Sequence, residues 1–364
     1  MEKKKIMFTG GGSAGHVTPN IAIINQMDKE KWDIQYIGSH EGIEKELIGK
    51  TNIPYHGISS GKLRRYFSMK NFTDIYRIQF GFLQASSILR KQKPDVVFSK
   101  GGFVTVPVVI AARSLHIPVF LHESDITPGL ANKIAKRFAT RIFTSFDEAA
   151  AHFPQEKTKA VGTPIRKELF QGDAEKGRSF LKFTNEKPVL AIMGGSLGAR
   201  KINETVREGL SGLLEQFQIV HICGKGNVDE SLKGTPGYRQ FEYVHEELSD
   251  ILAATDYMIT RGGSNAIFEF LNLRIPMLII PLTRQQSRGD QILNAKSFEK
   301  KGYAYMLEEE DLSQTSLLQK LTNLRGAADG MKEKMEEAAG KNTVEQIIEE
   351  IEAAAERRKG GRKQ

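Results

Sequence analysis

The sequence lacks several features that define other protein classes. It holds a single cysteine, Cys223, so an internal disulfide is excluded, as is a metal site built from several thiolates. Its apolar runs, such as 104–112 and 275–282, fall far short of the roughly 20 residues that a membrane-spanning helix needs. The start carries no secretory signal pattern, so we expect a cytosolic protein. No Asp-x-Asp motif occurs, which disfavours a nucleotide diphosphate held through a carboxylate-bound metal.

Length and charge set the next bounds. The chain has 364 residues, more than one hydrophobic core usually covers, so two domains are expected. Lysine and arginine number 52 against 44 acidic residues, giving a net charge of +8 and a pI near 9.3. This balance favours an anionic partner. Much of the excess lies in residues 62–90 and in the tail at 357–363.

The chain repeats its own pattern. A predicted strand at Lys4–Thr9 leads into a glycine loop and a helix near 19–27, and a strand at 188–193 leads into GGSLGAR (194–200) and a helix to about residue 214. Segments 96–123 and 257–282 also match, each with a basic residue before Gly-Gly (Lys100 and Arg261) and an Ile-Pro before the next strand.

This alternation of short apolar strands and helices predicts parallel sheets. The sequence therefore indicates an α/β protein with two Rossmann-like domains whose sheets face a cleft. We predict an N-terminal domain over 1–163, a C-terminal domain over 164–342, and a final segment, 343–364, whose helix packs back on the first domain. Ligands of such sheets sit at the carboxyl ends of the strands, which suits a transferase with one substrate in each domain.

The C-terminal half carries residues suited to a phosphorylated sugar ligand. In GGSLGAR the glycines let the backbone approach a phosphate, the helix start supplies N–H groups, and Ser196 adds a hydroxyl. Arg166 and Arg261 are the nearby cations. Glu269, about two turns into the helix after Gly262 and Gly263, can accept from both hydroxyls of a ribose.

The next helix offers two amides. Gln291 and Asn294 lie three residues apart at its start and could read sugar hydroxyls, although polar capping is an equally good interpretation.

The N-terminal half carries the candidates for proton transfer. In FTGGGSAGH (8–16) the spacing G-x-G-x-x-G occurs, but Asp33 begins the next strand instead of ending it, so a dehydrogenase is disfavoured. His16 stands where a helix should begin, and the positive helix end favours the neutral ring that a general base needs. HESD (122–125) follows a buried strand on the same side, so Glu123 is the other candidate base. The sequence leaves the choice open.

Six motifs together resemble the MurG family of bacterial cell-wall transferases, in order, over about residues 4–310. They are FTGGGSAGH, SKGGFVTVPV, HESDITPGLANK, GGSLGAR, TRGGSNAIFEFL and DQILNA. The resemblance implies the GT-B architecture and an inverting, metal-independent N-acetylglucosaminyltransferase that needs no cofactor. Its implied substrates are UDP-N-acetylglucosamine as donor and lipid I as acceptor, with lipid II as product.

The resemblance also implies roles for single residues. Ser196 would hold the diphosphate with help from Arg166 and Arg261, while Glu269 would take the ribose and the backbone near Val244 would read the uracil. Gln291, with Asn294, would contact the sugar. The loop formed by Ser13, Ala14 and Gly15 would meet the acceptor beside His16.

Two positions depart from the family pattern. Ser13 and Ala14 stand where the family usually has Thr-Gly, and Asp125 replaces the asparagine of HEQN. An ionised aspartate cannot donate a hydrogen bond, so the contact of Asp125 is either remade or changed in role.

The basic segment after residue 61 alternates with aromatic residues, which suits an anionic membrane surface. We expect peripheral attachment to the cytoplasmic face of the membrane, with Arg64 and Arg65 as contacts. Aromatic residues at helical spacing also serve in cores, so only part of this set need face lipid.

Two other readings remain open. A UDP-N-acetylglucosamine 2-epimerase or a glycolipid glycosyltransferase could share this architecture, and a 2-epimerase would turn over the donor without lipid. A basic nucleotide-binding protein is the non-enzymatic alternative. No nucleic-acid partner is expected, because the charge forms neither a groove-binding helix nor an aromatic stacking platform.

Overall fold

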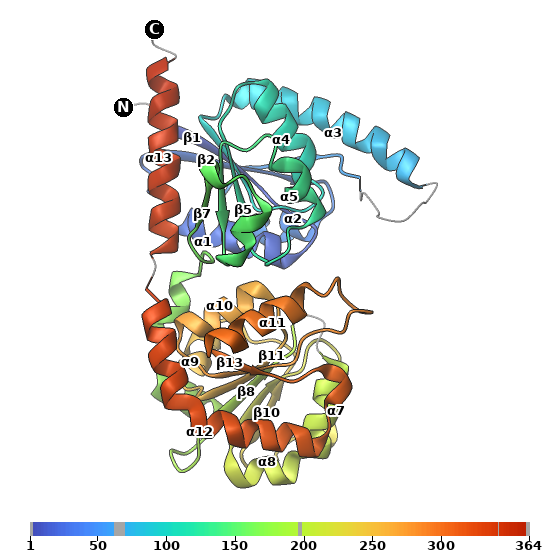
Figure 1. The fold of residues 1–364 in the computed structure, drawn as a ribbon, viewed down its shortest axis with the longest axis vertical. Coiled ribbons are helices and arrows are strands. Elements are labelled where there is room, and N and C mark those ends of the chain that lie inside the picture. Colours follow the sequence, from blue (N-terminus) through green and yellow to red (C-terminus); the bar gives the residue numbers. More distant parts are fainter. Residues whose placement is uncertain (1–2, 62–69, 196–198, 341, 362–364) are drawn as a thin grey trace. The chain divides into compact units, whose positions relative to one another are not determined.

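The computed structural model describes residues 3–61, 70–195, 199–340 and 342–361. The chain forms two compact units. The N-terminal unit comprises residues 1–166 and 342–364, and the C-terminal unit comprises residues 167–341. Each unit is built on one sheet whose strand pairs are all parallel (Figure 1).

The N-terminal unit has a seven-stranded sheet in the order β3-β2-β1-β4-β5-β6-β7. Its strands are β1 (Lys4–Thr9), β2 (Trp32–Ser39), β3 (Tyr55–Ile58), β4 (Val96–Ser99), β5 (Val119–Glu123), β6 (Arg141–Thr144) and β7 (Thr158–Ala160). Its α-helices are α1 (Thr18–Gln26), α2 (Ile43–Gly49), α3 (Lys70–Gln92), α4 (Thr105–Ser114), α5 (Leu130–Ala135) and α13 (Thr343–Gly361). Short 3-10 turns are η1 (Ala14–His16), η2 (Glu148–His152) and η3 (Gln155–Lys157).

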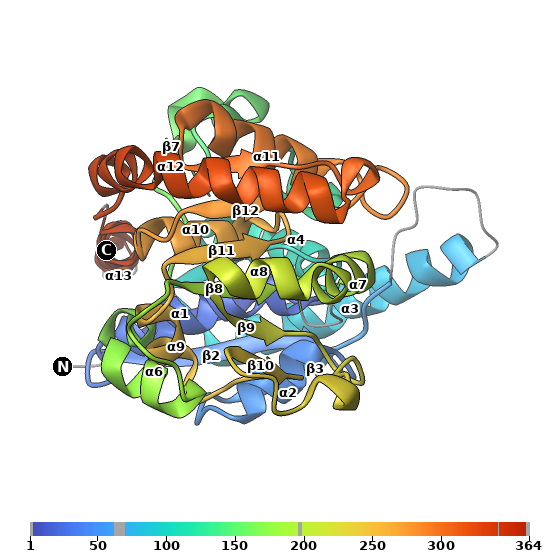
Figure 2. The same ribbon diagram turned by 90° about the horizontal axis from the view of Figure 1, so that it is seen from below.

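The C-terminal unit has a six-stranded sheet in the order β10-β9-β8-β11-β12-β13, and Figure 2 shows this order from β12 to β10. Its strands are β8 (Val189–Met193), β9 (Gln218–Ile222), β10 (Tyr238–Phe241), β11 (Tyr257–Thr260), β12 (Met277–Ile279) and β13 (Ala304–Met306). Its α-helices are α6 (Ala174–Leu181), α7 (Arg200–Glu208), α8 (Leu210–Gln216), α9 (Leu248–Ala253), α10 (Ser264–Asn272), α11 (Asp290–Lys301) and α12 (Gln314–Ala338). The 3-10 turns are η4 (Lys167–Gln171), η5 (Glu230–Leu232) and η6 (Glu309–Asp311).

The two sheets share one topology. Each starts at an inner strand, proceeds to one edge, and then returns to pair the fourth strand with the first, so β1 lies beside β4 and β8 lies beside β11. The glycine motifs that recur in the two halves of the sequence directly follow these four strands. The predicted fold class, two domains with Rossmann-like parallel sheets, is therefore confirmed.

The helix expected after GGSLGAR is interrupted. The sequence predicts one helix to about residue 214, whereas α7 ends at Glu208 and α8 begins at Leu210. Gly209 caps both helices with φ −94° and ψ 9°, outside the helical region. Glycine is a weak helix former, which explains a break at this residue.

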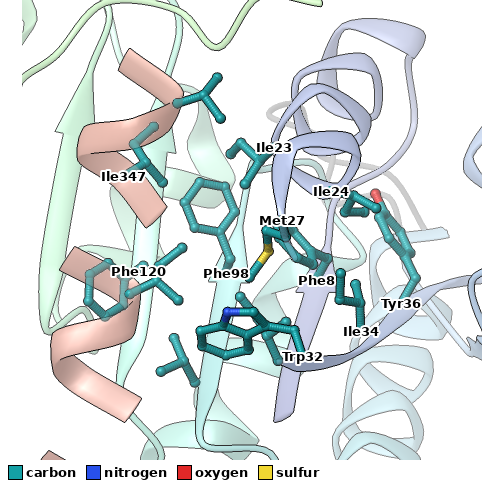
Figure 3. Packing of buried hydrophobic residues seen from close by; sticks show 14 of the residues in the cluster. Phe8, Ile23, Ile24, Met27, Trp32, Ile34, Tyr36, Phe98, Phe120 and Ile347 are labelled. Atoms are coloured by element: carbon teal, nitrogen blue, oxygen red, sulfur yellow. The ribbon is translucent and has the colours of Figure 1, made fainter. Parts of the chain in front are cut away.

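The final helix contributes to the core of the N-terminal unit. Val344, Ile347 and Ile351 of α13 are buried in one cluster with side chains of β1, β2, β4 and α1. In Figure 3, Ile347 projects from α13 toward Phe98 and Phe120. The ion pair of Arg141 with Glu350 (2.8 Å) and the hydrogen bond from Thr343 to the Val161 carbonyl add polar ties.

Helix α3 extends beyond the other elements of its unit (Figures 1 and 2). Tyr76, Phe80 and Leu83 are exposed along it, with 72%, 56% and 62% of their surfaces accessible. Phe82, by contrast, packs against the core. Among the described helices, none is both long enough and apolar enough to span a bilayer.

The packing of α13 yields a stability prediction. Ile347→Ala should lower the free energy of unfolding by about 2–5 kcal/mol, because it removes a fully buried side chain that the core cannot fully replace. Chemical denaturation of the full chain measures the loss. Glu349→Ala on the exposed face of α13 is the control and should change stability by less than about 0.5 kcal/mol. Equal effects of the two changes would mean that α13 does not stabilise this unit.

Candidate functional site

The buried carboxylate of Glu44 binds the loop after β1. This residue was not identified from the sequence. Glu44 of α2 is 1% exposed and accepts hydrogen bonds from the Gly12 N–H (3.1 Å), the Ser39 N–H (3.0 Å) and the Ser39 hydroxyl (2.6 Å). A Cβ at Gly11 would lie only 2.5 Å from this carboxylate. The glycine therefore lets the loop rest directly on Glu44.

The loops after β1 and β4 touch each other. The Gly11 N–H donates to the Gly101 carbonyl (3.2 Å), and the Lys100 N–H donates to the Thr9 carbonyl (3.0 Å). Gly102 has φ +91°, and a Cβ there would lie 2.1 Å from the Gly11 carbonyl oxygen. This contact, together with the positive φ, explains why the loop after β4 needs glycine at position 102.

His16 lies in the 3-10 turn η1, immediately before α1, and not in the α-helix itself. Its Nδ1 lies 2.9 Å from the Gly11 carbonyl oxygen and 3.1 Å from Ser13 Oγ. A carbonyl oxygen can only accept, so Nδ1 carries the proton. In the neutral ring, Nε2 then carries the basic lone pair. Ala14 and Gly15 complete the turn and are half-buried.

Glu123 is bound within its own loop. One carboxylate oxygen accepts from the Asp125 N–H (3.1 Å), and the other accepts from the Gly129 N–H (3.1 Å) and the Asn132 amide (2.9 Å). Burial, and after it the charge of Asp125, raises the pKa of Glu123. These contacts give Glu123 a clear part in shaping residues 123–132.

A buried lysine lies next to this loop. Lys100, at the end of β4, is 2% exposed, and its ammonium donates to Ser124 Oγ. Burial lowers the pKa of Lys100 to about 8, while the charges of Glu123 and Asp125 oppose that shift. Burial holds the pKa of His122 well below its usual value, and the charge of Lys100 lowers this pKa further. The aspartate that departs from the family pattern therefore has a cation as an electrostatic partner.

In the C-terminal unit, the glycine motif predicted to bind an anion lies between β8 and α7. Helix α7 begins at Arg200 with Ala199 as its N-cap, while Ser196 lies outside the described residues. A buried chain of hydrogen bonds anchors α7: Tyr238 O–H to His221 Nδ1 (2.9 Å), His221 Nε2 to Asn203 Oδ1 (2.9 Å), and Asn203 Nδ2 to the Cys223 carbonyl (3.0 Å). Burial lowers the pKa of His221 to about 3, so the ring stays neutral. Neither Asn203 nor His221 has a motif around it that the sequence could have revealed.

Arg261 follows β11, and its side chain lies toward β12 and β13. It forms a buried ion pair with Glu309 and donates to the carbonyls of Ile280 (3.1 Å) and Pro281 (3.4 Å). In the sheet order, β12 and β13 lie on the side of β11 opposite to β8 and the glycine motif that follows it. Glu309 was not singled out from the sequence, because it lies in a run of acidic residues that reads as solvated surface.

The remaining donor-side candidates lie in segments that follow β10, β11 and β12 of the same sheet. Asn294 is fully buried and donates to the Gly262 carbonyl (3.0 Å), which ties α11 to the loop after β11. Gln291 accepts from the Leu282 N–H (3.1 Å). Glu269 is half-buried on α10, and Val244 is half-buried between β10 and α9.

Three further candidates complete the set. Arg166 is the last residue of the N-terminal unit's first segment and is half-buried. Arg64 and Arg65 lie outside the described residues.

Comparison with family models matches both units. The N-terminal domain of glycosyltransferase family 28 matches residues 6–144, and the C-terminal domain of the same family matches residues 189–351. The two-unit parallel-sheet fold with its paired glycine loops thus defines a glycosyltransferase of the GT-B class. The chain belongs to glycosyltransferase family 28 and, within it, to the MurG group.

Relatives and solved structures agree with this assignment. A protein of Shouchella clausii named UDP-N-acetylglucosamine--N-acetylmuramyl-(pentapeptide) pyrophosphoryl-undecaprenol N-acetylglucosamine transferase is 60% identical over 96% of this chain and 99% of its own. A Bacillus cereus protein with the same name and the suffix 2 is 59% identical over 96% of this chain and 100% of its own.

Among solved structures, Acinetobacter baumannii MurG has a TM-score of 0.78 at 23% identity, covering 96% of this chain and 99% of that one. A putative UDP-N-acetylglucosamine 2-epimerase from Listeria monocytogenes has a TM-score of 0.72 at 12% identity, covering 98% of both chains. At these identities the likeness shows the fold alone.

The buried Lys100 predicts a pH effect on stability. Its native pKa of about 8 lies below the ordinary lysine value of about 10.4, so the unfolded chain binds more protons between these two pH values. The contribution of Lys100 to the free energy of unfolding therefore rises with pH across this window, by at most about 1.4 kcal/mol per pH unit. Lys100→Met should lose this rise.

Denaturation of the wild type and of Lys100→Met at several pH values in this window measures the difference in slope. Lys133→Met on the exposed face of α5 should keep the slope of the wild type. Parallel curves for the wild type and Lys100→Met would contradict a depressed pKa for Lys100.

Proposed function

We propose that this chain transfers N-acetylglucosamine from UDP-N-acetylglucosamine to the muramyl 4-hydroxyl of lipid I, producing lipid II for peptidoglycan synthesis. The observation that carries the proposal is the 59% and 60% identity, over nearly the full length, to two relatives named for this transfer. A 2-epimerase shares the fold at 12% identity, which says nothing of its chemistry.

The reaction requires one bond to form as another breaks. The acceptor oxygen attacks C1 of the sugar, the bond from C1 to the β-phosphate oxygen breaks, and its electron pair leaves with UDP. Attack from the face opposite the leaving group inverts the configuration at C1. The hydroxyl proton passes to a base on the acceptor side.

We assign that base to His16. Its Nδ1 proton is held by the Gly11 carbonyl, which leaves Nε2 as the basic nitrogen. Glu123 is the other candidate, but both of its oxygens already accept N–H groups of their own loop. We assign Glu123 to holding that loop, and Ser13, Ala14 and Gly15 to shaping the approach of the acceptor.

We assign Asp125 to an electrostatic interaction with Lys100. The lysine offsets the charge of the aspartate, so this carboxylate need not repel the acceptor diphosphate.

The donor is assigned to the C-terminal unit. Ser196 and the first turn of α7 would hold the diphosphate through N–H groups and the helix dipole, with Arg166 assisting. Arg261, which pairs with Glu309 on the side of the sheet away from β8, is assigned instead to holding the loop after β12. Glu269 would accept the ribose hydroxyls, and the backbone near Val244 would meet the uracil. Gln291 uses its carbonyl oxygen on Leu282, so its amide N–H group is the part that would meet a sugar hydroxyl. Asn294 would support it by fixing α11.

Transfer of labelled sugar tests the function and the base together. Wild-type protein, given labelled UDP-N-acetylglucosamine and a short-chain lipid I analogue, should yield labelled disaccharide lipid. His16→Ala should lower the turnover number by roughly 10²–10⁴ while UDP still binds, because only proton removal is lost. His152→Ala, an exposed histidine of η2, is the control and should be active.

The outcomes separate the alternatives. UDP release without labelled lipid would overturn the acceptor assignment in favour of epimerase or hydrolytic chemistry. Normal turnover by His16→Ala would shift the role of base to Glu123.

We further propose that the protein attaches peripherally to the anionic, cytoplasmic face of the membrane through α3 and the basic segment before it. Tyr76, Phe80 and Leu83 recur at helical spacing along one stripe and are exposed, which suits insertion at a lipid surface. Arg64 and Arg65 are assigned to the anionic headgroups.

Cosedimentation with phosphatidylglycerol-containing vesicles tests this attachment. Replacing Tyr76, Phe80 and Leu83 together by serine should lower vesicle binding at least about tenfold, since each apolar side chain contributes on the order of 1 kcal/mol. Arg64→Ala with Arg65→Ala should remove mainly the salt-sensitive part. Phe170→Ser, at an exposed aromatic of the C-terminal unit, should have no effect. Unchanged binding by the triple variant would refute the role of α3.

A further inference from the structure

Glu309 is a buried carboxylate in an otherwise exposed acidic run. It begins η6, shortly after β13 ends, and its side chain is 7% exposed, whereas Glu308 and Glu310 on either side are exposed. A buried carboxylate is costly to desolvate, so its position requires compensating partners.

Its partners come from three different segments of the chain. The side chain pairs with Arg261 and accepts from Gln286 Nε2 (3.3 Å), and the backbone carbonyl accepts from Lys201 Nζ. Lys201 is the second residue of α7, after β8; Arg261 follows β11; and Gln286 lies in the loop after β12. Glu309 therefore connects the loops that follow four neighbouring strands of one sheet, counting its own after β13.

These contacts bear most directly on the loop after β12. Arg261 donates to the Ile280 and Pro281 carbonyls at the start of that loop, and Gln286 lies in its middle. The same loop leads into α11, which carries Gln291 as its second residue. The Leu282 N–H donates to Gln291 in turn. A shift of Glu309 would thus move the start and the middle of the loop that leads to Gln291.

We propose that Glu309 is a positioning residue that fixes the loop 280–290 through Arg261 and Gln286, and so determines how tightly the sugar of the donor is held relative to its UDP part. This inference rests on the proposed function, because it takes a UDP-sugar as the ligand of this unit. Glu309 itself need not touch the ligand, since it acts through the loop.

Binding of two ligands, UDP and UDP-N-acetylglucosamine, tests the proposal by calorimetry. In Glu309→Ala, the ratio of the two affinities should shift against the sugar nucleotide on the order of tenfold, the value of one or two lost hydrogen bonds. The affinity for UDP should change much less. A purely structural loss would weaken both ligands alike, so the ratio distinguishes positioning from general loosening.

Two further variants keep the test informative if Glu309→Ala folds poorly. Gln286→Ala removes one contact of the same carboxylate from an exposed residue, and it should shift the ratio in the same direction by a smaller factor. Glu310→Ala, the adjacent exposed acid, should leave the ratio unchanged. An unchanged ratio in both Glu309→Ala and Gln286→Ala, or equal weakening of both ligands, would overturn the proposal.

The wild type separates this inference from the proposed function. A wild-type chain that binds UDP but not UDP-N-acetylglucosamine would overturn both. A chain whose preference depends on Glu309 but which transfers no sugar to lipid I would retain the inference and overturn the acceptor assignment.

Discussion

The parallel pairing of the first and fourth strands in each sheet is the constraint on which the rest depends. Since β1 lies beside β4, and β8 beside β11, the connections from these strands leave toward opposite edges. The loops at their carboxyl ends must therefore start close together and then separate, which opens the position where ligands of such sheets bind. In the N-terminal unit the two loops meet at Gly11 and Gly102, and only a residue without a side chain fits there.

A buried cation stands at the end of the fourth strand in both units. Lys100 follows β4 and contacts the loop after β5, while Arg261 follows β11 and reaches past β12 to the loop after β13. In each case the cation is compensated by acidic or hydroxyl groups from strands farther along the sheet. The two units therefore share more than the sequence pattern of a basic residue before Gly-Gly. In both, this cation links the loop after the fourth strand to the loops after the strands farther along the sheet.

Prediction from the sequence succeeded where the signal is local. Strand β1 has the predicted bounds, and β8 begins one residue later than predicted. The glycine motifs follow the ends of these strands, as predicted. The helix after β8 was misjudged at Gly209, because a single glycine does not reveal whether a helix bends or stops. The motifs also supply candidate site residues, whose roles stay predictions.

Residues that act from outside a motif could not be named. Glu44 and Glu309 each lie in polar segments where one carboxylate turns inward and its neighbours do not. Their burial is decided by partners distant in the sequence, such as Gly12 and Arg261, and no local pattern carries that information.

The return of α13 to the first unit has a consequence for how the chain folds during synthesis. Ile347 and Ile351 complete a core whose other members, Phe8 and Trp32 among them, leave the ribosome more than 300 residues earlier. The C-terminal unit is continuous from Lys167 to Lys341 and has all of its residues before α13 is made. The unit that is translated first is therefore the one that is finished last, and until then the apolar surface that α13 will cover remains open to chaperones or to premature association.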